Sequence, residues 1–309
     1  MTRHEDGQRL DNYLTSRLKG LPRSRLYRII RRGEVRINGS RCLPSTRLAT
    51  GDVVRIPPVR TAHDANNTAP LPKALKMLDS RVLYQDEHLL VIDKPAGVAV
   101  HGGSGIPFGV IEALKRSSLA GEFLELGHRL DRDTSGCLVL ARTRKALLSI
   151  HEAFRREAEL VSKVYLALAA RKWLDDRGDH FRIDHPLERY RDPLTGHSRM
   201  RVSSIGQSAA SQVELVRRFD SACLVKVHLE TGRMHQARVH LASVGLPVAG
   251  DDIYGDSGCN KALRDCGLKR LFLHASTLSF NHPENGQRQV FDAPLAPELS
   301  DVIEKLEKI

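Results

Sequence analysis

The sequence lacks the long apolar runs and paired cysteines that are typical of membrane-spanning and disulfide-bonded proteins. No stretch of about 18 uncharged apolar residues occurs, which argues against a transmembrane helix. The first ten residues, MTRHEDGQRL, lack the apolar segment of a secretory signal peptide. The five cysteines are odd in number and show no CxxC spacing, so we expect reduced thiols. These absences predict a cytoplasmic protein with no membrane partner.

Sequence motifs for the common cofactors are also missing. The chain has no GxxxxGK[ST] phosphate loop, no GxGxxG after a strand, no HExxH and no GxSxG. The HGGSG stretch at 101–105 is glycine-rich, but no lysine follows it, and its composition favours a simple turn. Around His128, His235 and His240, no cysteine or carboxylate completes a metal-ligand set. We therefore predict chemistry that needs no metal, nucleotide or other cofactor.

Positive charge is concentrated at the N-terminus. The 309-residue chain carries a formal charge of +11, and its 41% hydrophobic content is sufficient for a substantial core. Residues 1–60 hold 14 of the 48 Lys and Arg but only 5 of the 37 Asp and Glu, so the rest of the chain is nearly neutral. This asymmetry predicts a separate module that binds a polyanion such as a nucleic acid.

The basic segment has a readable internal pattern. Leu26, Ile29 and Ile30 follow the i, i+3, i+4 spacing of a helix. Another face of this predicted helix carries arginines: Arg25, Arg28 and Arg32. The following EVRING ends in Asn-Gly at 38–39, which predicts a hairpin, and GDVVRIPP at 51–58 predicts another strand. The pattern favours a surface for RNA phosphates, with a solvated arginine-rich face as the alternative.

A polar, proline-containing stretch separates this module from the rest of the chain. We assign residues 1–60 to the module, 61–80 to a linker and 81–309 to a second domain. In the second domain, strand-like runs such as HLLVIDKP and GCLVLART outnumber the helical stretches at 108–118 and 145–160. Strands without regular βαβ alternation predict an α+β domain with a mixed, mostly antiparallel β-sheet.

Charge is crowded into GHRLDRDTSG at 127–136, before an apolar run. Asp131 and Asp133 would point to the same side of an extended backbone, as a glycosidase-like pair of carboxylates requires. In a turn they would diverge, and only one would be functional. The Thr-Ser-Gly that follows favours a turn, and Gly136 can adopt a positive φ. We therefore expect a single working carboxylate.

Several motifs occur in a fixed order between residues 81 and 294. They are VIDKPAGVAVHGG, GHRLDRDTSGCLVLAR, KVYLAL, TGRMHQARVH and RLFLHASTLSFNHP. Together they resemble the motifs of the RluA-type pseudouridine synthases, including the HRLDxxTSG signature of that family. Residues 7–57, which begin with GQRLDNYL, resemble the S4 RNA-binding domain. This combination most resembles the RluC-type branch, which modifies large-subunit ribosomal RNA.

The resemblance implies a fold, an activity and a partner. The expected fold is a pseudouridine synthase catalytic domain with a small N-terminal α/β S4-like domain. The expected reaction isomerises specific uridines to pseudouridine in 23S ribosomal RNA, during large-subunit assembly, and we expect a monomer. The alternatives are a non-catalytic RNA-binding or ribosome-assembly protein on the same fold and, more distantly, a glycosidase.

The resemblance also implies roles for individual residues. Asp131 would be the catalytic carboxylate, acting either as a nucleophile or as a base on the sugar. Arg238 would be its ionic partner, and Tyr165 would stack on the displaced uracil and help to remove the C5 proton. Arg129 would fill the space that the flipped base vacates, and Leu273 would form an apolar wall.

The residues alone allow simpler roles for these side chains. Local pattern favours Arg238 on a solvated helix face and Tyr165 as an ordinary strand tyrosine. Leu273 could be a core leucine. Arg129 could pair with a neighbouring aspartate.

Overall fold

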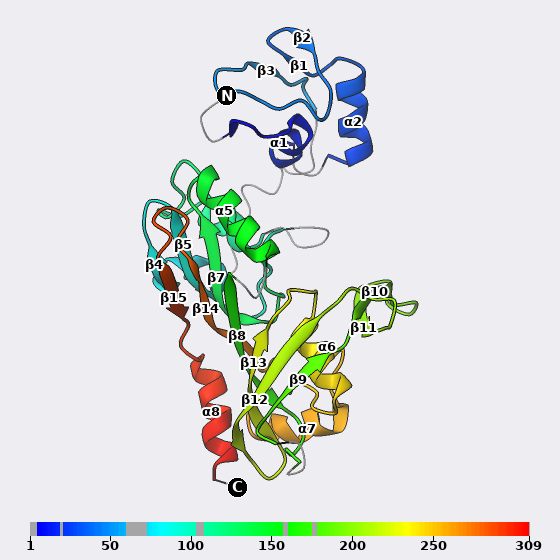
Figure 1. Ribbon diagram of the computed structural model, residues 1–309, viewed down its shortest axis with the longest axis vertical. Coiled ribbons are helices and arrows are strands. Elements are labelled where there is room, and N and C mark those ends of the chain that lie inside the picture. The colour runs from blue at the N-terminus through cyan, green and yellow to red at the C-terminus, as the bar shows by residue number, and fades with distance from the viewer. Residues whose placement is uncertain are drawn as a thin grey trace. The chain divides into compact units, whose positions relative to one another are not determined.

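The computed structural model of the chain describes residues 5–18, 21–59, 73–102, 108–156, 160–174 and 178–308. The contacts divide the chain into two units, residues 1–72 and 73–309 (Figure 1). Most of the predicted linker falls outside the described residues, and from residue 73 the chain carries two short helices of the second unit. These are α3 (Lys73–Lys76) and η2 (Leu78–Arg81). The exact bounds of the linker therefore stay a prediction.

The first unit combines two helices with a small antiparallel sheet. Its elements are α1 (Leu10–Arg17), α2 (Arg23–Arg31), β1 (Arg36–Ile37), β2 (Ser40–Arg41) and β3 (Val54–Arg55). The apolar face of α2 is buried as the spacing predicted, through Leu26, Ile29 and Ile30. Residues 38 and 39 form a two-residue turn between β1 and β2, both with positive φ, which Asn-Gly tolerates. The predicted helix and hairpin are confirmed.

The second unit is built on one ten-stranded sheet. Eight strands run in the order β4-β5-β7-β14-β8-β13-β12-β9, while β15 pairs with β14 and β6 with β7. Among the strands that the structure describes in this sheet, only β7 and β14 are parallel neighbours, so the predicted mixed, mostly antiparallel sheet is confirmed. The strands are β4 (Val82–Gln85), β5 (Leu89–Lys94), β6 (Glu125–Leu126), β7 (Ser135–Ala141), β8 (Val161–Ala169), β9 (His180–Asp184), β12 (Ala210–Arg218), β13 (Cys223–Leu229), β14 (Leu273–Asn281) and β15 (Arg288–Asp292).

Helices and a separate hairpin surround this sheet. The helices are α4 (Val110–Leu114), α5 (Arg144–Arg155), α6 (Gln236–Ser243), α7 (Ser257–Asp265) and α8 (Pro297–Leu306), and the hairpin strands are β10 (Leu187–Arg191) and β11 (Ser198–Val202). The helix predicted at 108–118 is shorter than expected. The Ser117 hydroxyl donates to the carbonyl of Leu114 and competes with continuation of the helix. No helix within the described ranges is long and apolar enough to cross a membrane.

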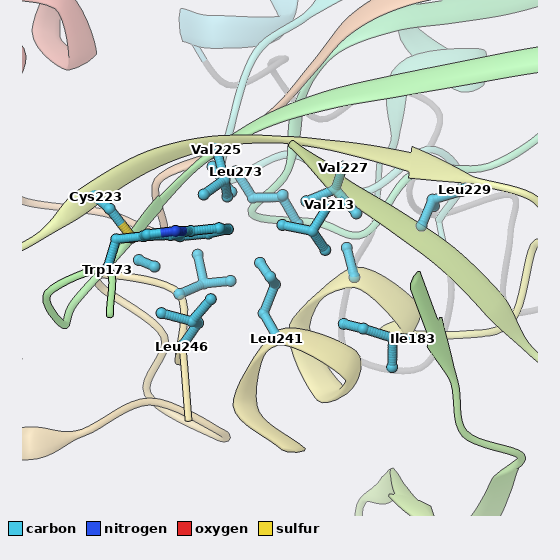
Figure 2. Packing of buried hydrophobic residues seen from close by; sticks show 14 of the residues in the cluster. Trp173, Ile183, Val213, Cys223, Val225, Val227, Leu229, Leu241, Leu246 and Leu273 are labelled. Atoms are coloured by element: carbon cyan, nitrogen blue, oxygen red, sulfur yellow. The ribbon is translucent and has the colours of Figure 1, made fainter. Parts of the chain in front are cut away.

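One hydrophobic core anchors the elements that carry most of the predicted site residues. Figure 2 shows Val213 and Val227 of the sheet opposite Leu241 of α6, with Trp173 at one end of the cluster. Leu273 of β14 belongs to the same cluster. The tight packing of such a core fixes strand and helix relative to each other, so side chains on them are held in constant geometry.

Gly136 fixes the charged turn against β14. Gly136 pairs with Ala275 at the parallel junction of β7 and β14, and its φ is 110°. A Cβ atom at this position would lie 2.2 Å from the carbonyl oxygen of Ala275. Only glycine fits this combination of close approach and positive φ, which confirms the predicted conformation.

Candidate active site

The stretch 127–136 is a turn that separates its two aspartates. The backbone N–H of Thr134 donates to the carbonyl of Asp131 at 3.2 Å. The Asp131 side chain is only 21% exposed and lines one cavity, whereas that of Asp133 is 44% exposed, pairs with Arg132 and lines a different cavity. The predicted turn is therefore confirmed. The paired-carboxylate arrangement, in which both aspartates face one site, is wrong.

The cavity next to Asp131 has a volume of about 400 Å³, which lies within the range of small-ligand sites. Its walls come from the turn, from strands β8 and β14, from the segment before α6 and from α6 itself. All the site residues predicted for the second unit line it: Arg129, Asp131, Tyr165, Arg238 and Leu273. Residues that are more than a hundred positions apart in the sequence thus form one site.

Arg238 lies between two carboxylates. Its Nε and Nη2 each donate to Asp251 at 2.7 Å, and its Nη1 lies 3.6 Å from Oδ2 of Asp131. The Arg238 side chain is 8% exposed, so the local interpretation of a solvated helix face is wrong. The short helix α6 is enclosed by its neighbours, which the local sequence pattern did not indicate.

Asp251 is a site residue that sequence reasoning missed. Its side chain is fully buried, and Oδ1 also accepts the backbone N–H groups of Ile253 and Tyr254. Burial would raise the pKa of Asp251, but the hydrogen bonds from Arg238 hold that pKa below its ordinary value. Burial likewise opposes the charge of Arg238, and Asp251 raises its pKa. The pair keeps the guanidinium charged and oriented toward Asp131.

His235 also approaches the catalytic candidate. Its Nε2 lies 3.8 Å from Oδ2 of Asp131, and its Nδ1 lies 2.8 Å from the hydroxyl oxygen of Tyr254. Burial lowers the pKa of His235, against the opposing effect of the nearby Asp131. Sequence reasoning considered this residue only as a metal ligand. Over the described part of the chain, no cluster of three His, Cys, Asp or Glu side chains could hold a metal ion.

Tyr165 and Leu273 lie on neighbouring strands, β8 and β14, and both face the cavity. Leu273 is also a buried member of the core, so its two predicted roles are compatible. Burial, and then the charge of Asp131, raises the pKa of Tyr165 well above its usual range. The ring faces the cavity, where it can stack on a base.

Three further cations line the cavity: Arg129, Lys163 and Arg233. Arg129 is exposed, and no ion pair joins it to Asp131 or Asp133 among the residues whose placement is described. The local interpretation of Arg129 as a partner of these aspartates is thus wrong. Lys163 is buried on β8 and was missed as a site residue. One carboxylate therefore faces several cations, which suits an anionic ligand.

Lys94 is hydrogen-bonded to the backbone of the turn. Its Nζ donates to the backbone carbonyls of Pro95, Val98 and Arg132, at 2.8 to 3.0 Å. Lys94 is fully buried, and burial lowers its pKa to about 7, while Asp133 and Asp131 oppose this shift. The DKPAG segment is thereby tied directly to the turn that carries Asp131.

The predicted RNA-binding arginines lie together in the first unit. Arg25 and Arg28 are on α2, and Arg32 caps its C-terminal end. All three side chains are exposed, and none forms an ion pair with another described residue. They are available to an external anion.

Comparisons with known proteins agree with this site and fold. Residues 88–243 match the RNA pseudouridylate synthase family, and residues 8–54 match the S4 domain. These matches cover the charged turn, α6 and the basic helix α2. The chain belongs to the RNA pseudouridylate synthase family, and it is an RNA-modifying isomerase with an N-terminal S4 domain.

Full-length relatives carry one particular name. The ribosomal large subunit pseudouridine synthase C of Haemophilus influenzae is 45% identical, over 98% of this chain and 92% of its own. The protein of the same name from Escherichia coli K12 is 43% identical, over 99% of this chain and 95% of its own. The predicted resemblance to the RluC-type branch is confirmed.

Solved structures show the same fold. Human RNA pseudouridylate synthase domain containing 4 is 27% identical and superposes with a TM-score of 0.61, over 79% of this chain and 98% of its own. Human RNA pseudouridylate synthase domain containing 1 gives a TM-score of 0.59 at 24% identity, over 75% of this chain and 90% of its own. The predicted fold class is confirmed.

Proposed function

We propose that this enzyme converts uridines to pseudouridine in large-subunit (23S) ribosomal RNA. The names of its full-length relatives support this substrate, and the S4 domain and the exposed arginines of α2 support an RNA partner. It acts in the cytoplasm as a monomer during large-subunit assembly, and it needs no cofactor. The non-catalytic alternative has no such support from the relatives.

One observation carries the catalytic part of the proposal: among the described residues, Asp131 is the one carboxylate in the cavity, and it lies beside a buried, oriented arginine. The reaction breaks the C1′–N1 bond of uridine, turns the base and joins C5 to C1′. It needs one ionised carboxylate, either as a nucleophile at C1′ or as a base on the sugar. Arg238 supplies a positive charge beside this carboxylate, with 3.6 Å between its Nη1 and Oδ2 of Asp131.

The remaining cavity residues act on the base. Arg129 enters the space that the flipped uridine leaves, since its guanidinium is exposed and its plane stacks on bases. Tyr165 stacks on the uracil ring, and Leu273 closes the cavity with an apolar wall. After the base has turned, Tyr165 helps to remove the C5 proton.

The basic helix holds the RNA rather than the target base. Arg25, Arg28 and Arg32 bind phosphates of structured RNA, which contributes affinity without reading sequence. Selection of the target uridine then depends on the shape of the RNA around the cavity.

The test is release of tritium from transcripts that contain 5-tritiated uridine, because joining C5 to C1′ displaces the C5 hydrogen. Purified full-length protein, with a chelator and without nucleotide, is incubated with large-subunit and small-subunit transcripts. We expect release, and mapped pseudouridine, in the large-subunit RNA only. Tight binding without release would support the non-catalytic alternative, and free uracil would indicate glycosidase activity.

A further inference from the structure

His235 has an unusual backbone conformation for a helix-capping residue. It precedes α6 with φ 54° and ψ 18°, in the left-handed region. Histidine visits this region more readily than most side chains, but the conformation still costs free energy. It places the ring between Tyr254 and Asp131, with contacts on both ring nitrogens.

Hydrogen bonding at Tyr254 defines which ring nitrogen of His235 carries the proton. The backbone N–H of Met200 donates to the Tyr254 hydroxyl oxygen at 2.9 Å. Nδ1 of His235 is the other group within hydrogen-bond distance of this oxygen in the described chain. Because the oxygen accepts from Met200, and Nδ1 is the one acceptor in reach of the hydroxyl hydrogen among the described residues, that hydrogen is directed to Nδ1. Nδ1 is then an acceptor, and in the neutral ring the proton lies on Nε2.

The protonated nitrogen faces the catalytic candidate. Nε2 of His235 and Nη1 of Arg238 approach the same oxygen of Asp131, Oδ2, at 3.8 and 3.6 Å. Both distances are longer than a hydrogen bond, as is common before substrate binds, and both contacts can tighten in the complex. Two donors on one carboxylate oxygen would fix the plane of the carboxylate.

Both donors are held by one short segment. Asp251 binds the guanidinium of Arg238, and Tyr254, three residues later, binds the ring of His235. The Tyr254 ring also lies under Arg238, with 5.1 Å between the guanidinium carbon and the ring centroid. Residues 251–254 thus contact both side chains and align them with Asp131.

We propose that His235 is a positioning residue of the isomerase: Tyr254 fixes Nδ1 as an acceptor, so that Nε2–H and Arg238 together hold Oδ2 while the carboxylate acts on the sugar. This role rests on the proposed function of Asp131. Burial lowers the pKa of His235, and the charged groups that act on the ring are Asp131, Arg238, Asp251 and Arg129.

The first test reads the tautomer directly. Long-range ¹H–¹⁵N spectra of full-length protein labelled in histidine should show His235 with its proton on Nε2, the signal being assigned by its loss in His235→Gln. Tyr254→Phe keeps the ring over Arg238 and removes only the hydroxyl, so it should convert His235 to a mixture of tautomers. A wild-type proton on Nδ1, or an unchanged tautomer in Tyr254→Phe, would overturn the proposal.

The second test separates turnover from binding. In Tyr254→Phe and His235→Leu we expect kcat to fall roughly tenfold, with KM changed less than about twofold, since an oriented group is lost and not an RNA contact. His235→Gln should retain more activity than His235→Leu, because its amide N–H₂ lies near the position of Nε2. Tyr84→Phe is the matched control, since it also loses a hydroxyl hydrogen bond, to Asp86, away from the cavity.

Two outcomes distinguish this role from the proposed function. Full activity of Asp131→Asn would overturn both. An inactive Asp131→Asn together with a wild-type kcat in His235→Leu would overturn only the role of His235.

Discussion

The arginines of the two units differ in what surrounds them. On α2 of the first unit, Arg25 and Arg28 are exposed and have no ion-pair partner among the described residues. In the second unit, Arg238 is buried and uses its Nε and Nη2 to bind Asp251. Exposed cations are screened by salt, and their effect depends on how many of them contact the ligand. The effect of a buried cation depends on its exact position relative to its partners. The units should therefore respond very differently to the loss of one charge.

The largest effect should follow from Asp251→Asn, which leaves the buried guanidinium of Arg238 without its charged partner. We expect kcat to fall roughly a hundredfold as Asp131 loses an oriented partner, and the free energy of unfolding of the second unit to fall by about 3 to 5 kcal/mol. Trp173, the single tryptophan, is buried in that unit and reports its unfolding in urea.

The matched control for this change is a surface pair. Arg182→Gln removes the exposed ion pairs with Glu230 and Asp184 and should cost far less stability than Asp251→Asn, with no effect on kcat. Equal losses of stability in Arg182→Gln and Asp251→Asn would contradict the contrast between buried and exposed arginines.

The second effect is a loss of stability in the second unit at mildly acidic pH. His128 accepts the backbone N–H of Val139 through Nε2 and stacks on Phe154, and burial lowers its pKa from 6.5 to about 4. The folded state favours the neutral ring of His128. The contribution of this ring to the free energy of unfolding is therefore complete above pH 6.5 and is lost as the pH falls toward 4. It amounts to roughly 3 kcal/mol. Trp173 fluorescence at several pH values measures it, and His128→Gln should flatten the dependence.

The first unit should lose stability in a lower pH range. Asp11 accepts hydrogen bonds from Arg9 and Tyr27. The hydrogen bond from Arg9 is the main cause of the low pKa of Asp11, which falls from 3.8 to about 2. The contribution is therefore present above pH 3.8 and is lost as the pH falls toward 2. We expect about 1 kcal/mol, because Arg9 is half exposed and screened by solvent. Hydrogen exchange of the α1 and α2 amides measures it, and an identical pH range in both units would contradict this assignment.

The smallest effects should come from single arginines of α2. Arg28→Gln should weaken binding to ribosomal RNA by about threefold at moderate salt and reduce the salt dependence by about one counterion, with kcat unchanged. Arg171→Gln, an exposed arginine in the second unit, serves as the control. A lower kcat in Arg28→Gln, measured with saturating RNA, would contradict a purely binding role.

Local sequence predicted those features that depend on local geometry. The Asn-Gly hairpin at 38–39 and the turn after Asp131 follow from residues that favour positive φ, and the apolar strands follow from their composition. The hairpin β10–β11 was missed because LERYR is mostly charged and shows no apolar alternation, and because the alternation in SRMRV spans only Met200 and Val202.

The charged partners in the site could not be predicted in the same way. Asp251 and Arg238 are thirteen positions apart in the sequence, and Tyr254 and His235 are nineteen positions apart. Both contacts exist only when α6 packs on the 251–254 segment. Nothing in GDDIYG by itself distinguishes a buried aspartate from a solvated one. Local pattern therefore misplaced Arg238, and only the motif resemblance indicated its role.

The central claim is that Asp131, and not its neighbour Asp133, is the catalytic carboxylate. Asp131→Asn and Asp133→Asn change the same functional group in the same turn, and only the first side chain lines the cavity. The direct measurement is single-turnover release of tritium from 5-tritiated large-subunit RNA bound to each full-length variant. We predict no detectable release by Asp131→Asn and near wild-type release by Asp133→Asn. Release by Asp131→Asn at the wild-type rate would contradict the account.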